Sequence, residues 1–407
     1  MKRATLSITV ALLTFVVGVS ASTAWLIKPR RQQILLTQPT NKEIRPGVTV
    51  DSAGKPTLEM VFVLDTTGSM SGLIEGAKQR IWGIVNDVMQ TPSRPNVRIG
   101  LVAYRDRQDA YVTQVLPLTD DLDKVYSTLM DYRAEGGGDE PEDVRRALAA
   151  GVREVGWSQT GTERVARIVF LVGDAPPHDD YADAPSTEVT VSEAVRLGMT
   201  VNTIQCGNSP ATKAAWQAVA RGGEGQYFAI AQDGGVENIA TPYDTRLSEL
   251  GTKLGSTFLA YGGGGGAAGT SFRRDVAATQ ASHEMKVARN APMQAVADRA
   301  VNKALNERAY AGDLLQSLEN ESVKLEAVKD EDLPDDLRKL SPEARRKETD
   351  RRLDERRRIR AEIVSLSKQR DAFLAASRKK QSSDTRGGFD TAVAVALKEQ
   401  MARKGIK

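Results

Sequence analysis

Between about residues 58 and 261 the sequence alternates short apolar segments with segments in which apolar residues recur at helical spacing. Residues 58–64 are almost continuously apolar, which is typical of a parallel strand that helices cover on both faces. Residues 73–89 repeat apolar side chains every three or four positions, as an amphipathic helix does. This alternation predicts an α/β fold with a doubly wound, mostly parallel sheet. In such a sheet, ligands bind beyond the carboxyl ends of the strands.

The other expected elements continue this alternation. They are a hairpin pair of strands at 97–104 and 111–116, strands at 166–172, 200–205 and 226–230, and helices at 121–132, 142–155, 211–221 and 243–260. The single cysteine, Cys206, follows one of these strands, and we expect it to be a small core residue. With one cysteine, no disulfide can form within the chain.

The N-terminal segment, residues 1–30, has the pattern of a targeting sequence. Lys2 and Arg3 precede a run of about 24 mostly apolar residues, and basic residues follow it. Either a cleaved secretory signal or an uncleaved membrane anchor fits this run. Both alternatives predict an exported chain in the periplasm or another extracytoplasmic space, and the anchor would attach it to the inner membrane. Residues 31–57 are expected to be a linker.

The C-terminal part follows a glycine-rich segment at 262–280, which we expect to be a flexible linker. Residues 281–407 are rich in charge and helix-prone. Ser341-Pro342-Glu343 is a good helix start, and the helix that follows has a narrow apolar stripe. This stripe fits either a coiled-coil seam, through which the chain could bind a partner or form oligomers, or a solvated helix that packs on residues 296–328.

Composition and motifs argue against two classes of function. A net charge of +3, with no basic stripe interleaved with aromatic residues, predicts no nucleic-acid partner. The sequence has no Gly-x-Ser-x-Gly elbow, no phosphate-binding loop and no His-Glu-x-x-His motif, so we expect no enzyme. A metal-assisted hydrolase would need a general base, for which His178 with Asp179 is the only candidate cluster.

Acidic residues fall where the expected strands end. Asp65 closes the first strand, Asp174 follows the strand at 166–172, and Asp139 precedes a helix. Carboxylates gathered at one sheet edge repel each other unless a cation joins them or one takes a proton. Thr67 and Ser69 alternate with Asp65 and would point the same way in an extended loop. Oxygen ligands with several waters suit Mg²⁺ best, and Ca²⁺ or Mn²⁺ would also fit.

The segment Asp65-x-Thr67-x-Ser69 resembles the Asp-x-Ser-x-Ser signature of the metal-ion-dependent adhesion site of von Willebrand factor A domains. Asp174 matches the later strand-end aspartate of that family, and Asp139 falls near a position usually held by threonine. The segment Gly-Gly-Gly-Asp-x-Pro-Glu at 136–142 resembles a bacterial and alpha-kinase-associated branch. The resemblance covers residues 58–261, roughly half of the chain.

This resemblance implies a Rossmann-like fold and a divalent cation held by Asp65, Thr67, Ser69, Asp139 and Asp174. It also implies a metal-dependent protein-binding module, for adhesion or scaffolding, in the cell envelope. A structural envelope protein with a vestigial metal site is the alternative. Asp139 has two interpretations, because an aspartate before a helix can be its N-cap alone or can also contact the metal.

Asp139 allows a first prediction. A third carboxylate would already more than neutralise a divalent cation, so the site should hold its metal without a partner and bind acidic ligands poorly. We expect Asp139→Thr to bind Mg²⁺ more weakly than the wild type in a metal titration. Equal affinities would contradict a direct role for Asp139 at the ion.

Overall fold

The computed structural model describes residues 55–138, 140–159, 164–235, 239–381 and 389–406, which all belong to one compact unit, residues 52–407. The expected signal or anchor at 1–30, almost all of the linker at 31–57, and Asp139 lie outside the described residues. Within the described residues, no helix has the length and apolar character needed to cross a membrane.

A six-stranded sheet forms the centre of the first half of this unit, in the order β3-β2-β1-β4-β5-β6. The strands are β1 (Thr57–Asp65), β2 (Asn96–Tyr104), β3 (Thr113–Thr119), β4 (Val165–Gly173), β5 (Met199–Cys206) and β6 (Glu224–Ile230). All neighbouring strands are parallel except β3, which runs antiparallel to β2. The predicted doubly wound, mostly parallel sheet is therefore confirmed, including the hairpin pair at its edge.

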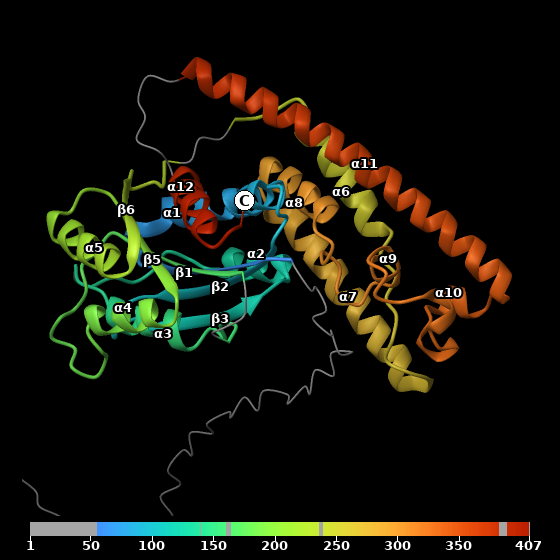
Figure 1. Cartoon of the computed structure of the whole chain (residues 1–407), viewed down its shortest axis with the longest axis horizontal. Helices are drawn as coiled ribbons and strands as arrows, with labels where there is room; N and C mark the ends of the chain where they lie inside the picture. The colour runs from blue at the N-terminus through green and yellow to red at the C-terminus, as the bar shows by residue number, and fades with distance from the viewer. Residues whose placement is uncertain (1–54, 139, 160–163, 236–238, 382–388, 407) are drawn as a thin grey trace, which may run out of the picture. The chain divides into compact units, whose positions relative to one another are not determined.

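Helices cover both faces of the sheet (Figure 1). On one face lie α1 (Ser71–Met89), α2 (Leu122–Asp131) and α12 (Phe389–Arg403), and on the other lie α3 (Val144–Arg153), α4 (Thr187–Arg196) and α5 (Pro210–Gly222). Successive residues of β1 serve opposite cores, since Met60 and Phe62 pack on the first face and Val61 and Val63 on the second. This explains why β1 is continuously apolar rather than alternating.

After β6 the chain leaves the sheet. Helix α6 (Asp244–Ser256) buries Leu247, Leu250 and Leu254 in a separate core with α8 (Met293–Leu305) and α11 (Pro342–Gln381). The sequence grouped this helix with the sheet, within residues 58–261, whereas its buried side chains face the helical part of the chain.

The glycine-rich segment differs from the expected flexible linker at 262–280. Helix α7 (Gly266–Asn290) begins within it. The preceding glycines are anchored, because Gly262 donates to the carbonyl of Asp332 at 2.7 Å and Gly264 donates to the Asp332 carboxylate at 2.7 Å. Both glycines have positive φ, which side-chain-bearing residues rarely adopt. The glycines therefore make a tight turn into α7.

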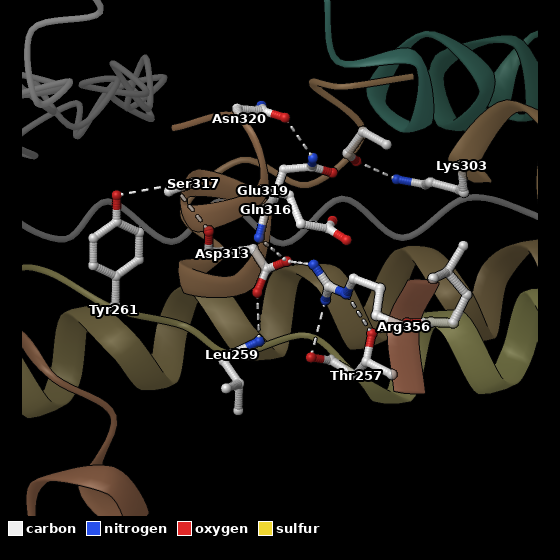
Figure 2. A network of polar contacts seen from close by, with 12 residues as sticks. Thr257, Leu259, Tyr261, Lys303, Asp313, Gln316, Ser317, Glu319, Asn320 and Arg356 are labelled. Atoms are coloured by element: carbon white, nitrogen blue, oxygen red, sulfur yellow. Dashed lines mark hydrogen bonds and ion pairs between the residues drawn. The ribbon is translucent and has the colours of Figure 1, made fainter. Parts of the chain in front are cut away.

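Helix α11 packs on its own chain through buried arginines as well as apolar residues. It contacts α6, α8 and α9 (Leu314–Glu319), with the short α10 (Asp335–Arg338) near its start. The guanidinium of Arg356 bonds to the Asp313 carboxylate, to the Thr257 hydroxyl at 2.8 Å and to the Thr257 carbonyl at 3.0 Å (Figure 2). Arg370 bonds further along the helix to Asp244 and Asp298, at 2.7 and 2.6 Å. Of the two alternatives for this stripe, the structure shows the intramolecular one.

Helix α12 brings the end of the described chain back to the sheet. Its first residue, Phe389, places its ring 6.0 Å from that of Phe62 in β1. The side chains of Asn202 in β5 and Gln400 in α12 exchange two hydrogen bonds, of 2.9 and 2.6 Å. One face of the sheet is therefore completed by a helix that begins about 160 residues after the last strand ends.

This arrangement predicts the effect of a single substitution. Phe389 is 1% exposed, so Phe389→Ala should lower the free energy of unfolding by about 3–5 kcal/mol through lost burial and a cavity. Val395 on the same helix is 49% exposed, and Val395→Ala should change it far less. Denaturant unfolding of both variants checks this, and equal effects would mean that α12 does not support the sheet.

Candidate metal centre

Asp65 is a fully buried acid at the carboxyl end of β1. Its Oδ1 accepts hydrogen bonds from the Thr67 amide at 2.9 Å and the Thr67 hydroxyl at 2.7 Å. Its Oδ2 is buried and has no hydrogen-bond partner. Burial, with a smaller contribution from the neighbouring Asp174 carboxylate, raises the pKa of Asp65 to about 7 against the lowering effect of the Thr67 hydrogen bonds. A proton or a bound cation would therefore stabilise the unpaired Oδ2 of Asp65.

Thr67 and Ser69 follow Asp65 in a short turn, not in the extended loop that the sequence analysis expected. The chain leaves β1 through a short 3-10 turn, Gly68–Met70, and enters α1 at Ser71. In this turn the hydroxyl oxygens of Thr67 and Ser69 lie 3.4 Å apart. The turn is held against the loop before α3, since the Gly68 amide donates to the Gly136 carbonyl at 3.2 Å. Two hydroxyls are thus placed beside the Asp65 carboxylate.

Asp174 follows β4 directly, next to the end of β1. A Cβ at Gly173 would lie 2.4 Å from the Tyr104 hydroxyl and 3.2 Å from Asp65 Oδ2, so a residue with a side chain would push the two strand ends apart. Asp174 Oδ2 accepts a hydrogen bond of 2.6 Å from the side-chain amide of Gln232. The same amide donates to the Ser69 carbonyl at 3.2 Å. Gln232 therefore connects the two loops that carry the predicted ligands.

Glu142 is a buried acid that the sequence analysis did not assign to the site. Its side chain is 2% exposed, and its Oε2 has no hydrogen-bond partner. Burial, together with the carboxylates of Asp65, Asp106, Asp109 and Asp174, raises the pKa of Glu142 to about 9. The acid clusters with the predicted ligands although the family signature does not include it.

The helix expected at 142–155 begins later, at Val144. Its N-cap is Asp143, whose carboxylate accepts from the Arg146 amide at 3.1 Å. The capping role considered for Asp139 therefore belongs to Asp143, and Asp139 itself is outside the described residues.

A second group of side chains, those of His178, Tyr181 and Asp106, lies near Glu142. The His178 ring stacks on the Tyr181 ring with centroids 4.1 Å apart, and the Tyr181 hydroxyl donates to Asp106 Oδ2 at 2.9 Å. His178 Nδ1 lies 2.9 Å from Asp180, not paired with Asp179. Asp106 and Asp109 lie in the turn between β2 and β3, and their carboxylates add negative charge to the centre.

The donor set fits a hard divalent cation. In the part of the chain that is described, no group of three or more His, Cys, Asp or Glu side chains is arranged to hold a metal. The four described residues of the predicted site are of another kind, with two carboxylates and two hydroxyls. Such a set leaves several positions to water, which Mg²⁺ accepts readily. The orphaned oxygen of Asp65 supports the same conclusion.

Comparison with known proteins assigns the sheet domain. Residues 59–241 match the family model described as the von Willebrand factor A domain. The chain is 39% identical over 126 residues to von Willebrand factor A domain-containing protein 7 of Rattus norvegicus, covering 31% of this chain and 13% of that protein. It is 30% identical over 121 residues to an ariadne-like RING finger protein of Acanthamoeba polyphaga mimivirus, covering 30% and 11%. The chain thus spans a small part of these relatives.

Two solved structures match part of the chain. The conserved protein BatB from Bacteroides thetaiotaomicron is 16% identical with a TM-score of 0.32, covering 43% of this chain and 90% of that one. Proximal thread matrix protein 1 from the mussel byssus, with a zinc-occupied MIDAS motif, is 17% identical with a TM-score of 0.33, covering 44% and 43%.

The raised pKa values predict a pH dependence in the presence of a chelator. Asp65 and Glu142 have ordinary pKa values of 3.8 and 4.5, and in the folded chain these rise to about 7 and about 9. The folded state then binds more protons than the unfolded state, so these groups make stability fall as the pH rises through this window. In denaturant unfolding at about pH 5 to 9, an Asp65→Asn, Glu142→Gln variant should lose stability less steeply than the wild type. Parallel curves would contradict the raised pKa values.

Proposed function

We propose that the von Willebrand factor A domain of this chain, matched at residues 59–241, holds a divalent cation and uses the surrounding loops to bind another protein. The observation that carries this proposal is the fully buried Asp65, whose Oδ2 has no partner beside two hydroxyls and a second acid. An unpaired buried carboxylate is costly, and a cation removes that cost. Domains of this family commonly mediate protein–protein interaction.

The proposed ligands are Asp65, Thr67, Ser69 and Asp174, and Asp139 remains a fifth candidate. All provide oxygen, which favours Mg²⁺, and Ca²⁺ or Mn²⁺ fit the same donors. A bound divalent cation would supply the positive charge that the buried carboxylates lack. The chain would then keep its loops in one arrangement, with Gln232 orienting Asp174 and Gly173 leaving room for the strand ends to meet.

The charge of the loops at this sheet edge indicates which partners are disfavoured. The described residues of the loops at 65–71, 105–112, 132–143, 174–186 and 231–235 carry twelve carboxylates and three arginines. The whole chain, in contrast, has a net charge of +3. One divalent cation leaves most of this local negative charge in place, so an acidic partner side chain would be repelled. We propose a partner that approaches with neutral or basic groups.

We propose binding rather than catalysis. The base that a metal-assisted hydrolase would need, His178, has its ring stacked on Tyr181 and its Nδ1 close to Asp180. The alternative of a structural envelope protein with a vestigial site differs from our proposal in one measurable property, because such a site would bind no cation. Export through residues 1–30, either as a cleaved signal or as an anchor in the inner membrane, completes the proposal.

Metal-dependent recognition predicts a difference in co-purified proteins. Wild type in Mg²⁺ should retain proteins that Asp65→Ala does not, and a chelator should release them from the wild type. Asp233→Ala, which changes an exposed acid at the same sheet edge, is the control. Mass spectrometry of the eluates gives the measurement. Identical protein sets for wild type and Asp65→Ala would contradict metal-dependent binding.

A further inference from the structure

Glu142 is a nearly fully buried acid that is not one of the four proposed ligands and has no role in the proposed function so far. Its side chain is 2% exposed and its Oε2 lacks a hydrogen-bond partner. A buried carboxylate without a partner is unfavourable, so the fold must compensate for it. The four charged groups that act most strongly on it, Asp65, Asp106, Asp109 and Asp174, are all carboxylates. These neighbours are all negative in their charged form, so they destabilise the Glu142 carboxylate, whereas a positive charge nearby would stabilise it.

The backbone fixes Glu142 to the loop that carries Asp174. The Glu142 amide donates to the Pro176 carbonyl at 3.1 Å, and its carbonyl accepts from the His178 amide at 3.0 Å. These two bonds form a parallel bridge to Pro177. Since Asp174 lies two residues before Pro176, any shift of Glu142 would also shift the loop of that ligand. Glu142 is therefore held by the scaffold in a fixed position relative to the site.

Glu142 and Thr67 both lie beside Gly137. A Cβ at Gly137 would lie 3.7 Å from Glu142 Oε1 and 3.4 Å from the Thr67 Cβ. A Cβ at this position would be in ordinary van der Waals contact with both residues, so Glu142 and Thr67 lie close to each other beside Gly137. The positive φ of Gly137, 86°, makes glycine the favoured residue here. The buried carboxylate thus lies close to the loop that carries the predicted hydroxyl ligand.

We propose that Glu142 is an outer carboxylate of the cation site and accepts a hydrogen bond from a water coordinated to the cation. This inference rests on the proposed function. The role is indirect because the described acids are not arranged for three of them to ligate one metal. Outer groups of this kind orient the coordinated waters and add charge, and their loss typically weakens metal binding by about 10–100-fold. Glu142 is then a positioning residue.

The test is a titration of the full chain with Mg²⁺ and with Mn²⁺ by calorimetry. Glu142→Gln keeps the size of the side chain and removes its charge, and we expect about 10–100-fold weaker binding. Glu140→Gln is the matched control, because it removes the same charge from an exposed side chain two residues away and should bind nearly as the wild type does. Asp65→Asn, which alters a proposed ligand, should abolish binding.

Thermal unfolding provides a second measurement on the same proteins. In chelator, Glu142→Gln should unfold at or above the wild-type temperature, because its uncharged amide replaces an acid that must hold a proton to be buried, and this shows that the variant is folded. The shift that Mg²⁺ produces should be smaller in Glu142→Gln than in Glu140→Gln.

The outcomes separate this inference from the proposed function. Wild-type affinity in Glu142→Gln, with binding lost in Asp65→Asn, would overturn the role of Glu142 and leave the cation site in place. An equal loss in Glu142→Gln and Glu140→Gln would also overturn it, since the effect would then be one of general charge. A wild-type chain that binds neither cation would overturn both.

Discussion

Burial of one carboxylate, that of Asp65, is the constraint on which the candidate site depends. Asp65 ends the central strand β1, between β2 and β4, so its side chain enters the layer between sheet and helices instead of water. The neighbouring residues are adapted to it. Thr67 satisfies one oxygen through its amide and hydroxyl, and Gly173 has no side chain to collide with the second. What the described chain does not provide is a hydrogen-bond donor for that second oxygen.

The position of Asp65 depends in turn on residues far along the chain. Helix α12 packs Phe389 against Phe62, three residues before Asp65 in β1. The Phe389 amide also donates to the Gly234 carbonyl at 3.0 Å, in the loop whose Gln232 bonds to Asp174. The helical region is fixed to the sheet side by a buried ion pair between Arg299 of α8 and Asp123 of α2. The sheet domain that the family model matches is thus completed by helices that the match does not include.

The sequence predicted what depends on local pattern and missed what depends on tertiary neighbours. Continuous apolar runs identified the parallel strands, and strand ends placed Asp65, Thr67, Ser69 and Asp174 together, because parallel strands open on one edge. Helix α4 was missed, since its Thr and Val residues favour strands and its burial decides the outcome. The glycines at 262–264 are typical of a linker, but contacts with Asp332 order them. Glu142 ends the motif at 136–142, but neither that motif nor the sequence around Gln232 indicated a role at the site, because only the fold brings these residues to it.

The acids at this edge must be neutralised by protons or by a cation, and the two compete. With the pKa of Asp65 at about 7 and that of Glu142 at about 9, protons occupy much of the site near neutral pH when no cation is present. Binding of a cation would then release protons, so affinity for the metal would rise with pH. The loops must keep one arrangement in both the protonated and the cation-bound site. The hydrogen bonds of the Gln232 side chain and of the Glu142 backbone hold them in place. The same acids that attract the cation therefore leave an acidic rim around it, which restricts the choice of partner more than the ion itself does.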